Sequence, residues 1–242
     1  MREILRELIT DPRGLIKLKK DMSDINYLLK KMDMDKQSLN EIKKRYDEDG
    51  FVILRNYLSH EQLKTLEEKA SEVASRLMKN VDFKDKYHHV LKSLNRYDSW
   101  FKDQLDEGPH IPVIGHLMGC DPVGASVAWF DRPIGDPVGI EPHTDLFGPD
   151  KREKLGATIW LSIDRATRAN GCLSYLRGSH KKIYQDKIPI PGVDKNSSEA
   201  VFAELEPGDA VIHDARIVHW SEGNLSEFPR RAVSYFYFSK KS

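Results

Sequence analysis

The sequence has few cysteines, no long apolar run and no excess of either charge. Its two cysteines, Cys120 and Cys172, form no C-x-x-C pair, which argues against both a zinc knuckle and a disulfide scaffold. The 38 basic and 38 acidic side chains cancel, and no basic run stands apart from acidic neighbours, so no nucleic-acid partner is expected. No apolar stretch could span a bilayer, and charges interrupt the N-terminus. These absences predict a soluble, unprocessed, cytoplasmic protein with no membrane partner.

The chain also lacks internal repeats, low-complexity tracts and linkers, so a single catalytic domain over residues 1–242 is expected. Residues 1–110 have mostly helical patterns, with a short strand near 51–55. Capping boxes at Ser38-Leu-Asn-Glu41 and Ser59-His-Glu-Gln62 mark two helix starts, because hydroxyl and carboxylate or amide groups there satisfy free backbone N–H groups.

From residue 111 to 240 the sequence pattern changes to short apolar runs separated by Gly, Pro, Asp and Asn, which is typical of an antiparallel sandwich or barrel. Glu206-Pro-Gly-Asp209 is the clearest turn. The fold is therefore predicted to be mainly β, buttressed by N-terminal helices. The candidate strands are Ala125–Phe130, Ala157–Ile163, Cys172–Tyr175, Ala200–Leu205, Ala210–His213 with its continuation to His219, and Arg231–Phe238.

Three residues have the pattern of a metal site. His143 and Asp145 are two positions apart, so on an extended segment their side chains point the same way and can share one metal ion. His219, far downstream, is a third ligand candidate. Two histidines and one carboxylate leave three positions open on Fe(II), enough to chelate an oxo-acid and admit O2. The same ligands also suit a catalytic zinc ion, so these residues alone do not separate an oxygenase from a hydrolase.

Arg230 favours the oxygenase. It lies eleven residues after His219, and the intervening Gly223, Asn224 and Pro229 suggest a hairpin-like loop that joins neighbouring antiparallel strands. A guanidinium beside the metal suits a bidentate ion pair with the remote carboxylate of 2-oxoglutarate. Ser221 is placed to add a hydroxyl donor to the same carboxylate. A zinc hydrolase would have no need of that pairing.

In order and spacing, the motifs from about Glu41 to Phe238 resemble the phytanoyl-CoA dioxygenase (PhyH-like) family of Fe(II)/2-oxoglutarate-dependent oxygenases. Arg177 replaces the family's usual Pro before Gly-Ser-His, and the first forty residues match no pattern of that family. The resemblance is carried by Tyr46-Asp-Glu-Asp-Gly-Phe-Val-Ile-Leu54, His143-Thr-Asp145, Ile159-Trp-Leu-Ser-Ile-Asp164, Asn170-Gly-Cys-Leu173, Gly178-Ser-His180, Gly208-Asp209, and His213-Asp214 through His219-x-Ser221-x-x-Asn224 to Arg230.

The resemblance implies a double-stranded β-helix (jelly-roll, cupin-like) core with His143, Asp145 and His219 as the iron ligands. It places Arg230 and Ser221 on the 2-oxoglutarate carboxylate, and Trp160 in the lining of the co-substrate pocket. The implied cofactors are Fe(II), 2-oxoglutarate as co-substrate, and O2.

The implied reaction is hydroxylation of an unactivated C–H bond in a small-molecule metabolite or natural product, with formation of succinate and CO2. Desaturation, epoxidation, cyclisation or epimerisation by the same chemistry remain open, as do a protein hydroxylase and a zinc-binding jelly-roll protein. Halogenation is disfavoured because Asp145 is present. The expected assembly is a monomer or a homodimer.

Several other residues have competing interpretations. His213 rivals His219 as the distal ligand, because an even spacing on an unbroken strand faces the same side, but family spacing favours His219. His180 is interpreted as a loop hydrogen-bonding residue. Tyr87-His-His89 is more typical of exposure or substrate contact than of a metal site. Arg231 should point away from Arg230 and is expected to be a surface charge.

The resemblance to the family implies a lid over the site before the core strands, and donors and an aromatic surface occur together there. A substrate with at least one anionic or polar group would suit it, and an exposed helix with cationic side chains is the alternative. The candidate substrate-binding residues are Lys92, Asn95, Arg96 and Trp100.

Overall fold

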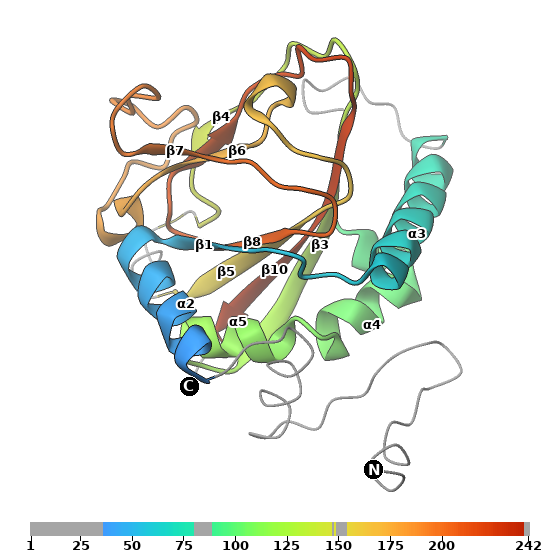
Figure 1. Ribbon diagram of the computed structural model, residues 1–242, viewed down its shortest axis with the longest axis horizontal. Helices are drawn as coiled ribbons and strands as arrows, with labels where there is room; N and C mark the ends of the chain where they lie inside the picture. The colour runs from blue at the N-terminus through green and yellow to red at the C-terminus, as the bar shows by residue number, and fades with distance from the viewer. Residues whose placement is uncertain (1–35, 80–88, 147, 149–153, 240–242) are drawn as a thin grey trace, which may run out of the picture.

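The structure, a computed structural model, describes residues 36–79, 89–146, 148 and 154–239. Its strands form two antiparallel sheets that face each other, which confirms the predicted jelly roll (Figure 1). The six-stranded sheet, in spatial order, contains β1 (Phe51–Leu54), β8 (Ala210–Asp214), β5 (Gly156–Ser162), β10 (Arg230–Ser239), β3 (Pro122–Arg132) and β2 (Val90–Leu91). The four-stranded sheet contains β4 (Ile140–His143), β9 (His219–Ser221), β6 (Leu173–Leu176) and β7 (Ala200–Ala203).

The six-stranded sheet is buried on both faces, because successive side chains of a strand point to opposite sides. In β5, Ile159 and Leu161 pack with the helices, whereas Trp160 belongs to the apolar cluster between the two sheets. The same alternation along β10 sends Ala232 inward and Val233 outward. Any polar residue in register with the inward set therefore enters the space between the sheets.

Helices cover the outer face of the six-stranded sheet (Figure 1). None of the helices in the described ranges combines the length and apolar character needed to cross a membrane. The α-helices are α2 (Lys36–Asp49), α3 (His60–Met78), α4 (Ser99–Glu107) and α5 (Ile111–Met118), and short 3-10 turns occur at Leu94–Arg96, Arg168–Asn170 and Ser179–Lys181.

Of the two predicted helix starts, one is confirmed and one is wrong. At α3, the Gln62 N–H donates to Ser59 Oγ at 3.3 Å, and the Ser59 N–H donates to Gln62 Oε1 at 2.9 Å. Ser38 lies within α2, which is already helical at Lys36, so it does not cap that helix. The helical part of the chain also continues through α5 to Met118, past the expected boundary at 110.

The predicted strands are present, with two corrections. The run from Ala210 is not continuous to His219, because β8 ends at Asp214 and β9 starts at His219 in the other sheet. Arg216 N–H and its Nε both donate to Asp214 Oδ1 at 2.8 Å, which stabilises the turn between the two strands. Strand β3 also runs two residues past the predicted end at Phe130, to Arg132.

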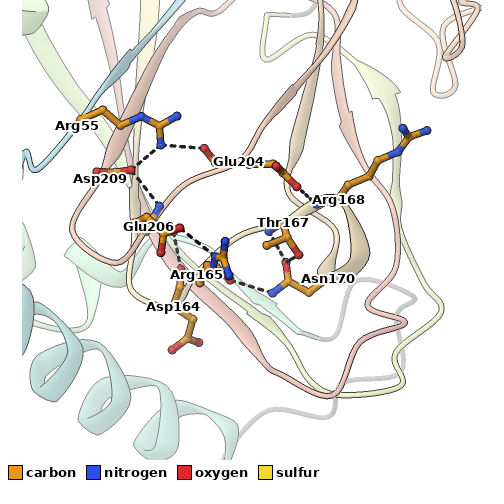
Figure 2. A network of polar contacts seen from close by, with 10 residues as sticks. Arg55, Asp164, Arg165, Thr167, Arg168, Asn170, Glu204, Glu206 and Asp209 are labelled. Carbon is orange, nitrogen blue, oxygen red and sulfur yellow. Dashed lines mark hydrogen bonds and ion pairs between the residues drawn. The ribbon is translucent and has the colours of Figure 1, made fainter.

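The predicted Glu206–Asp209 turn is confirmed, and it anchors a polar network at one end of the sandwich (Figure 2). The Asp209 N–H donates to the Glu206 carbonyl at 3.0 Å, and Gly208 has the positive φ of +87° that the turn requires. Asp209 Oδ2 accepts from Arg55 Nη1 at 2.7 Å, and Glu206 Oε1 lies 2.9 Å from Arg165 Nε. These contacts tie the end of β1 to the loops before β8 and after β5, three neighbouring strands of the six-stranded sheet.

Candidate functional site

The three metal-ligand candidates meet between the sheets. His143 ends β4 and His219 begins β9, and the two residues are direct partners across this strand pair, with ring centroids 4.2 Å apart. Asp145 follows β4, and its Oδ1 lies 3.7 Å from His219 Nε2. One ligand atom from each of the three residues lies within 4.8 Å of the others. His219 is buried, whereas His143 and Asp145 are partly exposed, so one side of the cluster is accessible.

Backbone carbonyls fix the orientation of both histidine rings. His143 Nδ1 lies 2.7 Å from the Glu141 carbonyl oxygen, and His219 Nδ1 lies 3.1 Å from that of Ile217. A carbonyl accepts only, so each Nδ1 carries the hydrogen and each Nε2 has a free lone pair. Histidines that bind metal ions are usually held in this way by their second nitrogen.

Two donors hold the outer oxygen of Asp145. Thr158 Oγ donates to Oδ2 at 2.7 Å, and His213 Nε2 lies 3.1 Å from the same oxygen. The carboxylate of Asp145 only accepts, so His213 carries its hydrogen on Nε2, and its Nδ1 accepts from the Tyr175 O–H, which lies 2.9 Å away. His213 therefore uses both nitrogens to orient the carboxylate, and Oδ1 stays directed at His219.

The electrostatics favour the charge states that a metal ion needs. Burial alone would raise the pKa of Asp145, but His219 and the hydrogen bond from His213 hold it well below its usual range, so the carboxylate is ionised. Burial lowers the pKa of His219 to about 3, with His143 adding to the effect, and burial also lowers the pKa of His143. Both rings are therefore neutral at pH 7 and able to donate their Nε2 lone pairs.

Arg230 is the second notable group between the sheets. It is 1% exposed, and no carboxylate in the described part of the chain pairs with its guanidinium. Its Cζ lies 5.4 Å from the ring centroid of Trp160, and both Arg230 Nε and Trp160 Nε1 are buried without an acceptor among the described residues. Burial lowers the pKa of Arg230 to about 9, with Arg132 adding to the effect, so the group still carries its charge at pH 7. An unpaired buried cation beside orphaned donors is the environment of an anion site.

Arg132 is a residue of this region that the sequence did not single out. It is buried and is the register partner of Arg230 in the β3–β10 pair. Its Nη1 donates to the Val138 carbonyl and lies 3.4 Å from Asp136 Oδ2, and its Nη2 donates to Ser221 Oγ at 3.4 Å. Extending the predicted strand beyond Phe130 would have found it, since Arg132 is two positions further along the same face.

Two expectations about Arg230 and its neighbour need correction. The hairpin from His219 to Arg230 is wrong, because β9 belongs to the four-stranded sheet and β10 to the six-stranded sheet. Arg132 connects the two strands, because it is the register partner of Arg230 and its Nη2 lies 3.4 Å from Ser221 Oγ. Arg231 points outward as expected, yet it is more than a surface charge, since its Nη2 lies 2.7 Å from Asp164 Oδ1 and 2.8 Å from Glu67 Oε1.

The four substrate-binding candidates do not form one surface. Lys92 is exposed and close enough to His143 to affect its pKa, so it lies nearest the metal cluster. Asn95 Oδ1 accepts the Val127 N–H at 3.0 Å, which is a structural contact to β3. Trp100 packs on the helix-side core against Phe101, and Arg96 is exposed. Of this set, the structure brings only Lys92 toward the site.

The other histidine motifs singled out in the sequence are Gly178-Ser-His180 and Tyr87-His-His89. His180 lies in the 3-10 turn Ser179–Lys181, and its Nε2 is 3.2 Å from the Asp47 carbonyl oxygen, which matches the expected loop role. Tyr87 and His88 lie outside the described residues. Thr158 and Tyr175, which support the cluster, were not predicted. The even spacing of Thr158 from Trp160 on β5 was the available signal for the first, and no signal in the sequence marked the second.

Solved structures with the same fold include two that were solved with 2-oxoglutarate (alpha ketoglutarate) bound. The epimerase SnoN, solved with Fe3+, alpha ketoglutarate and nogalamycin RO, superposes with a TM-score of 0.71 at 19% identity and covers 85% of each chain. EvdO2 from Micromonospora carbonacea var. aurantiaca, solved with 2-oxoglutarate, gives a TM-score of 0.68 at 21% identity, over 86% of this chain and 92% of its own.

Sequence comparison identifies the family. A probable phytanoyl-CoA dioxygenase of Caenorhabditis elegans is 24% identical over 81% of this chain and 74% of its own length. Phytanoyl-CoA dioxygenase 1 of Oryza sativa subsp. japonica is 26% identical over 78% of this chain and 85% of its own. The sequence profile of phytanoyl-CoA dioxygenase (PhyH) matches residues 46–232, which include every residue of the metal cluster and both buried arginines. The chain therefore belongs to the phytanoyl-CoA dioxygenase (PhyH) family.

Proposed function

We propose that this protein is an Fe(II)/2-oxoglutarate-dependent dioxygenase that hydroxylates an unactivated C–H bond of a small-molecule metabolite or natural product. One observation carries the proposal. A cluster of two neutral histidines and one ionised carboxylate shares the interior of the jelly roll with a buried arginine that has no ion-pair partner in the described ranges. The first feature suits a divalent cation, and the second suits an organic anion.

The donor set fits iron(II). His143 and His219 would hold the ion through Nε2, because their Nδ1 atoms are bound to carbonyls. Asp145 would hold it through Oδ1, because Oδ2 is taken by Thr158 and His213. Two histidines and one carboxylate occupy one face of an iron(II) ion and leave positions for a chelating oxo-acid and O2.

The anion site fits 2-oxoglutarate. Arg230 would pair with the remote carboxylate, and Trp160 and Ser221 lie beside or near it as further donors. The pairing removes an uncompensated charge and satisfies orphaned buried donors, both of which are costly otherwise. A zinc-binding jelly-roll protein would leave Arg230 without a function.

When bound, iron(II) and 2-oxoglutarate supply with O2 the oxidising power for C–H cleavage, with release of succinate and CO2. The chain's own residues provide position and environment. Thr158 and His213 keep Asp145 ionised and aimed, and the apolar cluster around Trp160 and Tyr175 excludes water from the interior. Partial exposure of His143 and Asp145 leaves the substrate an approach to the metal from one side.

The outcome of C–H cleavage depends on how the substrate is held. The solved relatives include an epimerase and a carbocyclase from nogalamycin biosynthesis, so the same fold supports other outcomes. We propose hydroxylation because the metal face is accessible from one side, and this outcome needs only that the substrate be positioned beside it.

The test is an anaerobic titration of purified protein with iron(II) and then 2-oxoglutarate. A weak visible charge-transfer band is expected only when both are present, and oxygen should then produce succinate. A small-molecule library, screened for stimulated succinate formation and a mass gain of one oxygen atom, identifies the substrate. If iron binds but no band and no succinate appear, the oxygenase proposal fails and the zinc-protein alternative gains support.

A further inference from the structure

Arg132 donates a hydrogen bond to Ser221, and the direction of this bond limits where the Ser221 hydroxyl hydrogen can point. Arginine has only donors, so in the 3.4 Å contact between Arg132 Nη2 and Ser221 Oγ the hydroxyl oxygen is the acceptor. A serine hydroxyl has a single hydrogen, and no described residue accepts that of Ser221. With Arg132 at the lone pairs, the hydrogen must point elsewhere.

The arginine that imposes this orientation is itself rigidly held. Arg132 and Asp136 are both buried and lie 3.4 Å apart, and Arg132 Nη1 also donates to the Val138 carbonyl. The Asn224 side chain donates to the Arg132 carbonyl oxygen at 3.0 Å. The positive charge of Arg132 is therefore matched by Asp136, in contrast to that of Arg230, and its planar fork has little freedom to turn away from Ser221.

We propose that Arg132 is a positioning residue that fixes Ser221 as a hydrogen-bond donor to the remote carboxylate of the co-substrate, and so makes the enzyme select a dicarboxylic oxo-acid. This inference rests on the proposed function. Arg230 supplies the charge for that carboxylate, and Arg132 acts through Ser221. Without Arg132, the hydroxyl can rotate and its hydrogen is no longer directed into the site.

A purely structural role for Arg132 gives different results. Arg132 also braces the turn between β3 and β4, through Asp136 and Val138. Loss of that brace would lower the melting temperature and weaken all oxo-acids alike. Positioning of Ser221 would instead weaken only an acid that has the remote carboxylate.

The experiment is a double-mutant cycle read with two co-substrates. The variants are Arg132→Met, Ser221→Ala and the double mutant, each loaded with iron(II) under anaerobic conditions. The ligands are 2-oxoglutarate and 2-oxopentanoate, which has the same chain length and lacks the remote carboxylate. Dissociation constants come from the charge-transfer band, and melting temperatures are measured in parallel.

For 2-oxoglutarate, each single change should weaken binding about tenfold, as expected for one hydrogen bond to a charged group. The double mutant should be no weaker than Arg132→Met alone, because the two residues act in one step. For 2-oxopentanoate all variants should stay within about threefold of wild type. Should Arg132→Met not fold, Arg132→Lys takes its place in the cycle, since a lysine cannot donate to Val138 and Ser221 from a planar fork.

Two results would overturn the inference. If the losses multiply to about a hundredfold, Arg132 acts independently of Ser221. If both oxo-acids weaken equally, its role is structural. The proposed function fails in a different way, because wild-type protein would then show no 2-oxoglutarate band at all.

Discussion

Two sites in the jelly-roll interior suit ligands of opposite charge: a metal end, formed by His143, Asp145 and His219, and an anion end, formed by Arg230 and Trp160. At the metal end, Asp145 is ionised and aimed by Thr158 and His213, and it faces two neutral rings. At the other end, Arg230 is buried as a cation with no ion pair among the described residues, and Arg132 is already neutralised by Asp136. Iron(II) and the dianion 2-oxoglutarate are therefore expected side by side. The charge of Asp145 would balance the first, and the charge of Arg230 would balance the second.

The two ends also differ in how they are built. The metal end is held by backbone carbonyls and short side-chain contacts, so the ligand atoms are in place before any ion arrives. The other end retains buried donors without acceptors, at Arg230 Nε and Trp160 Nε1. The first end should therefore tolerate the absence of its ligand with little strain, whereas the second should be stabilised when its anion binds.

The largest expected effect comes from removing the one carboxylate of the metal end. Asp145→Ala should abolish iron binding and succinate formation while leaving the fold intact, because the sheets do not depend on that side chain. His219→Ala should behave likewise. Iron content, succinate and circular dichroism check these outcomes, with Asp121→Ala, at an exposed aspartate, as the matched control. Full turnover by the Asp145 variant would remove this residue from the site.

At the other end, Arg230→Leu should weaken 2-oxoglutarate binding roughly a hundredfold or more, because it deletes a pair between a buried cation and a carboxylate. Iron affinity should stay near that of wild type. Anaerobic titration of the iron-loaded variant gives the constant directly. Loss of iron together with 2-oxoglutarate would mean that the two ends are not separable.

His110 is buried outside both sites, so it tests the effect of burial on a histidine pKa and on stability by itself. Burial lowers the pKa of His110 to about 4, and its Nδ1 lies 3.0 Å from the Tyr57 hydroxyl. In the unfolded chain the pKa of this histidine is near 6.5, so between pH 4 and pH 6.5 the unfolded state binds more protons than the folded state. The stability that His110 contributes is therefore present above pH 6.5 and is lost as the pH falls toward 4. The loss from pH 8 to pH 5 should be about 2 kcal/mol.

Denaturant unfolding of metal-free protein at both pH values tests this expectation. His110→Asn, which keeps an acceptor for Tyr57, should reduce the pH-dependent loss by that amount. His60→Asn changes an exposed histidine and should leave the loss unchanged. An unchanged pH profile in the His110 variant would contradict the assignment of a depressed pKa to this residue.

A substitution at His213 tests whether this residue binds the metal ion itself or only orients the ligand Asp145. His213→Ala removes a donor to Asp145 Oδ2 but none of the three ligand atoms, so iron should still bind, with affinity lower by about tenfold. The variant should keep measurable turnover when iron is in excess. If it loses iron completely while His219→Ala retains it, the assignment of the distal ligand is wrong.

Much of this arrangement could be predicted from the sequence, because local spacing encodes it. The shared direction of His143 and Asp145 follows from alternation on an extended segment. An antiparallel sandwich or barrel follows from short apolar runs between turns, and the α3 start follows from the capping box at Ser59. These features depend on neighbours within a few residues.

The pairing of segments far apart in the chain could not be predicted from these patterns. The turn at 214–218 moves the chain from one sheet to the other, and this placed β9 and β10 in different sheets against expectation. Arg132 meets Arg230 and Ser221 only through strand register and the facing of two sheets. Tyr175 reaches His213 across the same interior. No periodicity records such contacts between elements far apart in the chain.

The smallest expected effect on co-substrate binding is that of Arg231, which is the neighbour of Arg230 in sequence and its opposite in direction. Its Nε and Nη2 donate to Asp164 at 2.8 and 2.7 Å, and Nη2 also contacts Glu67 of α3. Arg231→Leu should therefore lower stability by about 1 to 2 kcal/mol, since it breaks partly buried charged hydrogen bonds between β10, the loop after β5 and α3. The dissociation constant of 2-oxoglutarate should stay within about threefold of wild type, because the side chain lies on the helix face of the sheet. Thermal unfolding and the anaerobic titration separate the two effects. If Arg231→Leu loses 2-oxoglutarate affinity and Arg230→Leu keeps it, the inward and outward positions of β10 are exchanged, and the anion end of the interior has been assigned to the wrong arginine.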